Sequence, residues 1–273
     1  TYIMRYCLKY IKNKYIQEAD EILFGDNHGD SMIDAIELYP HADFIYEVVD
    51  EPDWDYLKMI NSRLNKTNRR LIISTMYTTI AQSAKENGLA FYFSFAINNF
   101  ADLQTVNELG ACYALITAPI FFEQDKLEKF SIPIRYRANV AYSGYLTTKR
   151  VNANAAFIRP DDVEFYDNDT TTIEFGASSS EQEEVLYRLY KYDKTWPGDL
   201  NMVITTLNVE PAPMNRMIGP DFAKHRLNCG QRCVEGDTLQ CHLCHNQMSL
   251  AIPSKIKNYI DNVILPVRTN DQN

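Results

Sequence analysis

Short apolar runs rich in β-branched and aromatic residues alternate with segments of helical periodicity along most of the chain. Such runs predict buried strands, and apolar residues spaced three and four apart predict helices that pack on them. The predicted strands are residues 3–8, 21–25, 44–49, 70–75, 90–96, 112–120, 132–140, 155–158 and 171–175, and residues 201–208 can add one more. The predicted helices are residues 31–38, 53–64, 78–86, 100–109, 123–130 and 180–192.

Repeated strand-helix-strand units of this length predict a parallel sheet with right-handed crossovers. About eight strands in this order favour an α/β fold, a (β/α)8-type barrel in which some helices are short or missing. An open doubly wound sheet is the alternative, but no glycine-rich dinucleotide motif follows an early strand. We expect the barrel in residues 1–210, a Cys/His metal-binding segment in residues 211–250, and a tail docking on the barrel in residues 251–273.

Composition and charge narrow the class of protein. With 45% hydrophobic and 23% charged residues the chain is globular, and 27 basic against 36 acidic residues give a net charge of −9. This balance argues against nonspecific coating of nucleic acid. No apolar stretch reaches the roughly 20 residues that cross a bilayer, so we expect a soluble, cytoplasmic protein that binds no membrane.

Four cysteines near the C-terminus form the pattern Cys-x3-Cys-x7-Cys-x2-Cys, with two histidines among the last pair. Two thiolate pairs closed by short loops can converge on one soft cation, so a structural zinc ion or a [4Fe-4S] cluster is predicted, and spacing alone does not separate the two. The predicted ligands are Cys229, Cys233, Cys241 and Cys244, with His242 and His245 as further metal ligands. Cys7 and Cys112 lie in apolar runs and are predicted to pack in the core.

In a barrel, catalytic residues lie where strands end and the following loops begin. The loop after residues 21–25 contains Asp26, His28 and Asp30, and there His28 can act as a base or a ligand oriented by either carboxylate. The same residues also suit a plain turn before a helix.

The small residues 175–180 precede a predicted helix and can approach an anion. A Ser180 cap with Glu183 as its capping-box partner is the alternative interpretation.

Arg135 and Arg137 alternate along one predicted strand, so both point to the same side of the sheet. Arginines inside a barrel require acidic partners or an anionic substrate, and Arg137 is therefore a candidate catalytic residue, whereas outward-facing arginines would simply be solvated. Asp50, Glu51 and Asp53 at another strand end are candidate counter-ions, and Glu-Pro-Asp before a helix is equally a capping device.

Residues Phe157 to Val163 place Arg159 at a strand end before Pro160, Asp161 and Asp162. This Ile-Arg-Pro-Asp-Asp step, followed by four cysteines, resembles the iron-sulfur barrel proteins once called collagenase-like peptidases. That family includes anaerobic ubiquinone-hydroxylation accessory proteins and RNA base hydroxylases. The resemblance implies a TIM-type barrel whose four cysteines hold a [4Fe-4S] cluster. Arg159 is a candidate catalytic residue because it stands at the end of a predicted strand.

Two hypotheses follow. The first is a metal- or cluster-dependent barrel enzyme that hydroxylates or otherwise modifies an RNA base or a quinone-like ring without oxygen. The second is a non-catalytic binding or assembly protein, in which a zinc-bound C-terminal module presents Arg226, Arg232, His242 and His245 to a protein partner.

Overall fold

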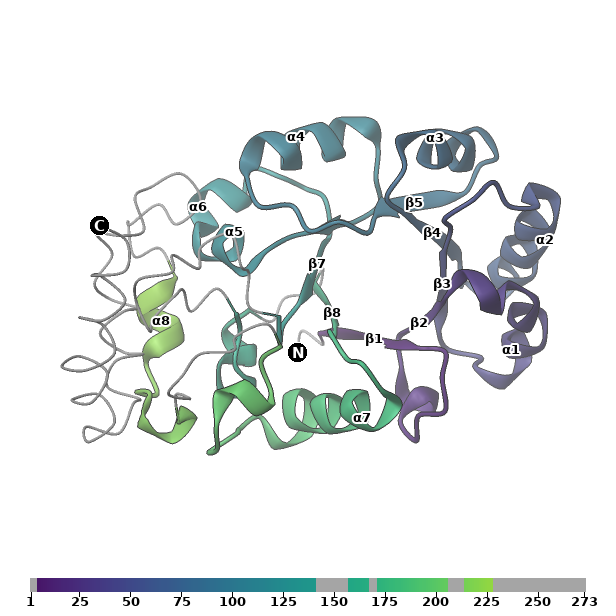
Figure 1. The fold of residues 1–273 in the computed structure, drawn as a ribbon. Helices are drawn as coiled ribbons and strands as arrows, with labels where there is room; N and C mark the ends of the chain where they lie inside the picture. Colours follow the sequence, from purple (N-terminus) through teal and green to yellow (C-terminus); the bar gives the residue numbers. More distant parts are fainter. Residues whose placement is uncertain (1–3, 141–156, 167–170, 206–213, 228–273) are drawn as a thin grey trace, which may run out of the picture.

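The computed structural model describes residues 4–140, 157–166, 171–205 and 214–227. Eight parallel strands form one sheet in the order β5-β4-β3-β2-β1-β8-β7-β6, which curves into a nearly closed barrel (Figure 1). The ends of the sheet meet through isolated parallel bridges between Tyr92 and Tyr113 and between Ile97 and Ile116. The predicted barrel is confirmed. The strands are β1 (Arg5–Lys9), β2 (Glu21–Phe24), β3 (Asp43–Glu47), β4 (Leu71–Thr75), β5 (Ala90–Phe93), β6 (Ala114–Leu115), β7 (Ile134–Arg137) and β8 (Thr171–Glu174).

Helices connect the strands and surround the barrel (Figure 1). Some connections are reduced, as predicted, because β1 and β2 are joined only by the single turn η1 (Ile16–Glu18). The α-helices are α1 (Met32–Leu38), α2 (Trp54–Asn65), α3 (Thr78–Glu86), α4 (Phe100–Leu109), α5 (Ala118–Phe122), α6 (Gln124–Leu127), α7 (Ser180–Arg188) and α8 (Phe222–Arg226). Shorter turns are η2 (Asp26–Ser31), η4 (Pro160–Tyr166), η5 (Leu189–Asp193, a π-helix), η6 (Leu200–Met202) and η7 (Asn215–Met217).

Local sequence sets where the helices begin and end. Asp53 caps α2 by accepting a hydrogen bond from the Tyr56 N–H at 3.1 Å, and Asn99 caps α4. Gly110 ends α4 with φ of 84°, a left-handed conformation that glycine adopts without strain.

The start of α7 differs from the prediction. Ser179, not Ser180, is the cap, and its hydroxyl accepts from the Gln182 N–H at 3.2 Å. Gln182 reaches back to the Ser178 N–H at 2.7 Å. Since the cap is one residue earlier than predicted, Glu183 is not a capping-box residue and turns inward instead.

Strand alternation divides the core into two layers. One set of side chains packs between the sheet and the helices, as Phe24 and Phe44 do with ring centroids 4.8 Å apart. The opposite set fills the barrel interior and includes Cys7, Ile45, Ile72, Tyr92 and Tyr113. The predicted burial of Cys7 is confirmed, and Cys112 packs against the same interior cluster.

Two predicted strands are wrong in the described residues. Residues 157 and 158 form no strand and lead directly into η4, and η6 occupies part of the predicted strand 201–208. Thr205 nevertheless forms an isolated bridge with Val140. The predicted boundary near residue 210 and the tail 251–273 lie in or next to residues outside the described part and stay predictions. No helix in the described ranges is long and apolar enough to cross a bilayer.

Candidate functional site at the C-terminal end of the barrel

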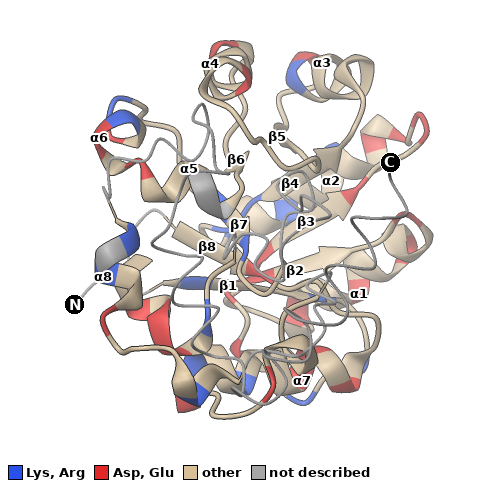
Figure 2. Cartoon of the chain, turned by 60° about the vertical axis from the view of Figure 1, so that its left-hand side comes forward, with Lys and Arg blue, Asp and Glu red and all other residues tan. Residues whose placement is uncertain are grey.

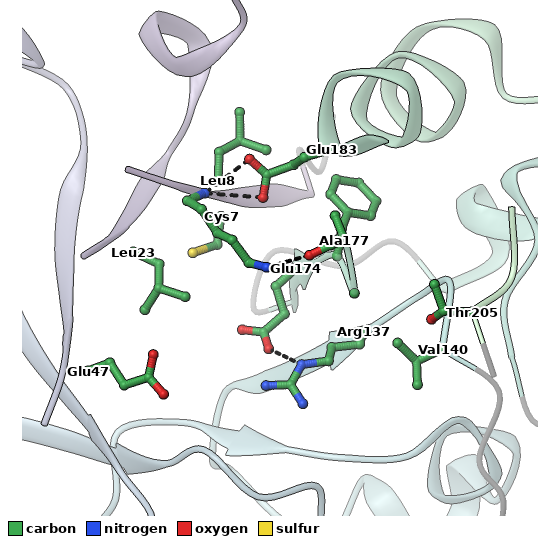
Figure 3. Close-up of a pocket in the computed structure, with 13 residues that line it drawn as sticks. Cys7, Leu8, Leu23, Glu47, Arg137, Val140, Glu174, Ala177, Glu183 and Thr205 are labelled. Carbon is green, nitrogen blue, oxygen red and sulfur yellow. Dashed lines mark hydrogen bonds and ion pairs between the residues drawn. The ribbon is translucent and has the colours of Figure 1, made fainter. Parts of the chain in front are cut away.

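A cavity of about 360 Å³ lies at the C-terminal end of the barrel, the position where catalytic residues were expected (Figure 3). The ends of β1, β2, β3, β7 and β8 contribute to its wall, together with the segments that follow β7 and β8. The lining residues are Cys7, Leu8, Lys9, Leu23, Glu47, Arg137, Val140, Glu174, Phe175, Gly176, Ala177, Glu183 and Thr205.

Arg137 and Glu174 form an ion pair on one wall of this cavity. The Nε–H of Arg137 donates to Oε1 of Glu174 at 2.7 Å, and the Arg137 side chain is 40% exposed. Its two terminal nitrogens have no partner among the described residues, and they point into the cavity in Figure 3. A guanidinium held at Nε presents these nitrogens as a ready fork for an anion.

Glu174 is ionised despite its burial. Burial acts to raise the pKa of this carboxyl group, but Arg135 and Arg137 outweigh burial and hold the pKa below its usual value of 4.5. The Nε–H of Arg135 donates to Oε2 at 2.7 Å, so both carboxylate oxygens are bound by arginines of β7.

Lys9 and Glu183 form the wall of the cavity next to β1. The ammonium group of Lys9 donates to the Ala177 carbonyl oxygen at 2.8 Å. The carboxylate of Glu183 accepts the Lys9 backbone N–H at 3.2 Å and the Asn13 side-chain amide at 2.9 Å. These bonds attach α7 to the end of β1. Burial raises the pKa of Glu183, and the bonds from Lys9 and Asn13 counteract burial only in part.

Two other lining residues have different chemistry. Glu47 is exposed at the end of β3 and has no hydrogen-bond partner among the described residues, so it can accept a proton. Cys7 is 2% exposed, and burial raises the pKa of its thiol far above the usual value, so the thiol is neutral and a poor nucleophile.

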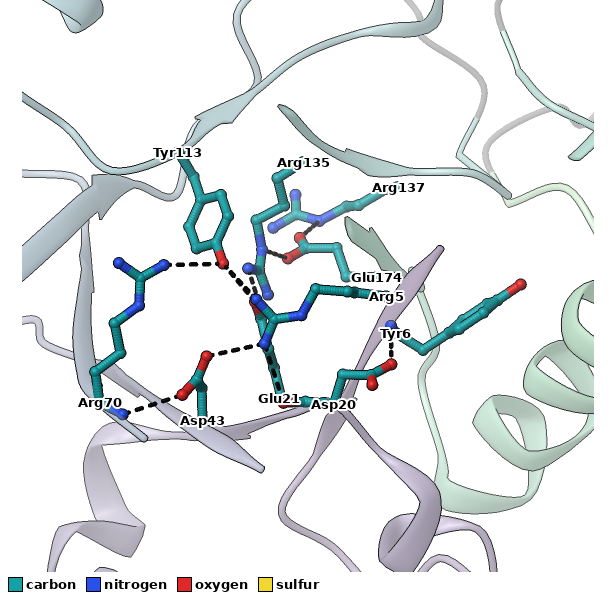
Figure 4. A network of polar contacts seen from close by, with 10 residues as sticks. All are labelled: Arg5, Tyr6, Asp20, Glu21, Asp43, Arg70, Tyr113, Arg135, Arg137 and Glu174. Carbon is teal, nitrogen blue, oxygen red and sulfur yellow. Dashed lines mark hydrogen bonds and ion pairs between the residues drawn. The ribbon is translucent and has the colours of Figure 1, made fainter. Parts of the chain in front are cut away.

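A network of charged side chains fills the barrel below the cavity (Figure 4). Arg135 has no exposed side-chain surface, and its Nη1 donates to Oε2 of Glu21 at 2.5 Å. The guanidinium also stacks over the rings of Tyr92 and Tyr113, 4.8 and 5.2 Å from their centroids. Its Nη2 has no hydrogen-bond partner among the residues that the structure describes.

The network continues toward the N-terminal end of the strands. The Tyr113 hydroxyl donates to Oε1 of Glu21 at 2.7 Å and accepts from Arg5 and Arg70, each at 3.2 Å. Arg5 also donates to Asp43 at 2.8 Å. Figure 2 shows the acidic and basic residues on the outer helices, with a further group of both signs between the strands.

The inward arginines therefore have acidic partners, as the sequence required. The candidate counter-ions Asp50, Glu51 and Asp53 were wrong, and the alternative capping role is confirmed for Asp53. Glu21 and Glu174 bind them, whereas Asp53 caps α2 and Glu51 accepts a hydrogen bond from the Trp54 indole at 2.5 Å. Asp50 makes no ion pair among the described residues.

The Asp26, His28 and Asp30 loop is η2, on the same end of the barrel as the cavity but not part of its lining. Asp26 and Asp30 are exposed, and the half-buried ring of His28 packs edge-on against Tyr10 with centroids 5.7 Å apart. The loop is held by Tyr46, which donates to the Asp26 carbonyl oxygen, and by Tyr56, which donates to that of Gly29. These contacts describe an ordered turn, and the catalytic role of the three residues stays a prediction.

Arg159 lies away from the cavity, in a buried polar cluster. Its Nε and Nη2 donate to the two oxygens of Asp162, each at 2.6 Å, and its Nη1 donates to Asn215 at 2.9 Å. Asn215 in turn donates to Asp161 and to the Trp196 carbonyl oxygen. The Arg-Pro-Asp-Asp segment thus joins η4 to η7 through these hydrogen bonds, which is a structural role. The catalytic role of Arg159 stays a prediction.

The predicted metal ligands Cys229, Cys233, Cys241, Cys244, His242 and His245 lie outside the described residues. Within the described residues, no three His, Cys, Asp or Glu side chains are grouped closely enough to hold a metal ion.

In the predicted anion-binding loop 175–180, the backbone groups of Gly176 are already hydrogen-bonded within the protein. The Gly176 N–H donates to Oδ1 of Asn139 at 2.9 Å, and the Asn139 amide donates back to the Gly176 carbonyl oxygen at 2.9 Å. A Cβ on Gly176 would lie 2.6 Å from Cγ2 of Val140, so only glycine fits there. This close approach places the loop against the end of β7 and forms part of the cavity wall.

Of the five candidate catalytic residues, only Arg137 lines the cavity. Sequence reasoning missed Lys9, Glu47, Glu174 and Glu183. Lys9, Glu47 and Glu174 are charged residues at the last position of an apolar strand. A charged residue at the last position of a predicted strand could therefore have identified these three cavity-lining residues from the sequence.

No known family model matches the chain, and no curated protein matches it. Solved structures with a similar backbone include phosphoribosyl anthranilate isomerase from Thermotoga maritima, at 9% identity over 69% of this chain and 99% of that chain, with a TM-score of 0.43. A structure described as native KDPGal matches at 12% identity over 68% and 91%, with a TM-score of 0.41. A cube-shaped, porous protein cage designed by fusing symmetric oligomeric domains matches at 11% identity over 69% and 72%, with a TM-score of 0.40. At these values no conclusion about function follows.

Proposed function

We propose that the chain is a barrel enzyme whose substrate is a small molecule with a carboxylate group, bound in the cavity by Arg137. The observation that carries this proposal is the arginine fork: Glu174 holds Nε at 2.7 Å, and the two terminal nitrogens face the cavity without a partner among the described residues. A fork of this kind matches the two oxygens of a carboxylate.

The charge of the cavity favours a carboxylate over a phosphate. The lining contains two basic residues, Lys9 and Arg137, and three acidic residues, Glu47, Glu174 and Glu183. With two positive and three negative side chains, the sum is −1, so a singly charged anion meets less repulsion than a doubly charged phosphate. Glu47, which has no partner among the described residues, is the group that would take up or return a proton in this enzyme.

Acetate binding tests this function, with affinity measured by NMR titration. We expect saturable binding to the wild-type chain and at least about tenfold weaker binding to Arg137→Gln, because the charged fork is lost. Arg63→Gln changes an exposed arginine on α2 and should bind like the wild type. Glu47→Gln should keep or strengthen binding, because a negative charge leaves the cavity. Absence of saturable binding, or equal binding by Arg137→Gln, overturns the proposal.

A second proposal rests on the cysteine spacing. We propose that Cys229, Cys233, Cys241 and Cys244, with His242 and His245 as further ligands, hold Zn²⁺ or a [4Fe-4S] cluster. A cluster would support the oxygen-independent hydroxylation of an RNA base or a quinone-like ring that the family resemblance implies. A zinc ion would support the alternative, a binding or assembly protein.

Iron, sulfide and zinc content of the full chain, purified without oxygen, tests this second proposal. Stoichiometric iron with sulfide favours the cluster, and stoichiometric zinc favours the structural module. Cys241→Ser should lose the metal, and Cys112→Ser, which changes a cysteine beside the barrel interior, should keep it. A metal-free wild-type chain overturns the proposal and leaves the carboxylate site unaffected.

A further inference from the structure

Three large apolar side chains are exposed at the C-terminal ends of β3 and β4. Val49 is 43% exposed, Met76 is 64% exposed and Tyr77 is 49% exposed. We call these three residues the apolar rim. Other exposed apolar residues, such as Leu38 and Leu109, lie singly at the ends of separate helices. Scattered apolar residues are ordinary on a protein surface, whereas a group at one place marks a binding site.

Strand register places the members of the apolar rim next to one another. β3 and β4 pair in parallel with Glu47 opposite Ser74, and the Val48 N–H donates to the Ser74 carbonyl oxygen at 2.9 Å. Two residues further along each chain, just past the strand ends, this register brings Val49 opposite Met76, and Tyr77 follows directly as the residue before α3.

The apolar rim follows the cavity wall along the chain. Glu47, the last residue of β3, lines the cavity, and Val49 comes two residues after it. The rim thus begins where the wall of the cavity formed by β3 ends, whereas Arg137 and Glu174 lie on β7 and β8. A ligand held by Arg137 that extends past Glu47 meets apolar side chains.

We infer that the substrate is amphipathic, with a carboxylate bound by Arg137 and an unbranched alkyl or aryl arm lying on the apolar rim. This inference rests on the proposed carboxylate site and adds the class of substrate. Methionine suits the contact because its flexible thioether adapts to apolar groups of different shapes. The arm removes Val49 and Met76 from water, which is the source of the added affinity.

Two probes with the same head group test the inference, acetate and hexanoate, with dissociation constants measured by NMR titration. We expect hexanoate to bind at least about tenfold more tightly than acetate to the wild-type chain, since its additional methylene groups are buried. In the double variant Val49→Ser with Met76→Ser, hexanoate affinity should fall to within about threefold of acetate affinity, and acetate affinity should not change. Leu38→Ser with Leu109→Ser is the matched control and should retain the preference.

The outcomes separate this inference from the proposed function. If acetate binds and hexanoate binds no more tightly, the carboxylate site stands and the amphipathic substrate is overturned. If neither probe binds, the proposed function fails and the inference falls with it. If the serine variants lower the oligomeric state in sedimentation without changing the preference for hexanoate, the rim is an interface between copies of the chain and the inference is overturned.

Discussion

Oε1 of Glu174 lies 2.7 Å from Nε of Arg137, at the ends of two neighbouring strands, and this contact sets the direction of the arginine fork. The second oxygen of Glu174 is bound by Arg135, which is fully buried and also bound to Glu21. The orientation of a group that faces the cavity therefore depends on an ion-pair network inside the barrel.

Glu174→Gln should lower the free energy of unfolding at neutral pH by about 3 kcal/mol, because two arginines lose their shared carboxylate. The folded-state pKa of Glu174 lies below 4.5, so its stabilising contribution is present above that pH and is lost as the pH falls below it. Urea unfolding at several pH values should show a weaker acid dependence in the variant than in the wild type. An identical dependence would show that Glu174 is not ionised in the folded state.

Arg135→Gln should destabilise the chain by about 3–5 kcal/mol, because it leaves Glu21 and Glu174 buried with one fewer cation. Arg188→Gln is the control, since Arg188 and Asp193 form an exposed pair worth less than about 1 kcal/mol. Denaturant unfolding of both variants measures the difference. Similar small losses in the two variants would contradict the network as drawn in Figure 4.

Glu183→Gln and Glu183→Ala should separate the charge of this residue from its hydrogen bonds. Burial raises the folded-state pKa of Glu183, so ionisation opposes folding, and the stability associated with the protonated form is lost as the pH rises through that pKa. The amide variant still accepts the Lys9 N–H and should change stability little at neutral pH. The alanine variant leaves that N–H unpaired and should cost about 1–3 kcal/mol by thermal or urea unfolding. Equal losses in the two variants would assign the effect to the charge of the carboxylate, which both variants remove, and would contradict the role given to its hydrogen bonds.

Asp162→Asn should destabilise the chain by about 3 kcal/mol while acetate binds as in the wild type, because Arg159 loses its buried counter-ion and neither residue lines the cavity. Unfolding and acetate titration on the same preparation provide both measurements. Weaker acetate binding in the fully folded variant would instead support the catalytic role predicted for Arg159.

Cys7 and Cys112 should resist iodoacetamide in the folded chain near about pH 8 and react after unfolding in about 6 M guanidinium. Burial is the cause in both, since it raises the pKa of Cys112 to about 12 and that of Cys7 well above its usual value. Peptide mass mapping identifies which thiols are labelled. Rapid labelling of Cys7 in the folded state would show that the cavity opens far enough for the reagent to reach this buried thiol.

The fold was predictable because local patterns and topology agree. Apolar runs of strand length and stop signals such as Gly110 are encoded within a few residues, and a parallel barrel is the closure that such units favour. The pairing of Arg135 was not predictable in detail. Its partners Glu21 and Glu174 lie 114 and 39 residues away in the sequence, and only the closed sheet brings them together.

The candidate site was predictable in its location and less so in its residues. Arg137 was recognised because it alternates with Arg135 on one strand. Arg159 was selected because it ends an apolar run, yet that run is not a strand, and the arginine binds Asp162 in the same turn. The role of Glu183 depended on a helix cap one residue from its predicted position.

The isolated bridges between β5 and β6 have a mechanical consequence. Because so few backbone pairs join β5 to β6, the barrel should open locally between these two strands first. Amide hydrogen exchange there should be faster than between β3 and β4, which pair along most of their length. The strands that carry Arg137, Glu174 and Glu47 belong to the continuous part of the sheet. Local opening between β5 and β6 can thus occur without moving the residues that would hold a ligand.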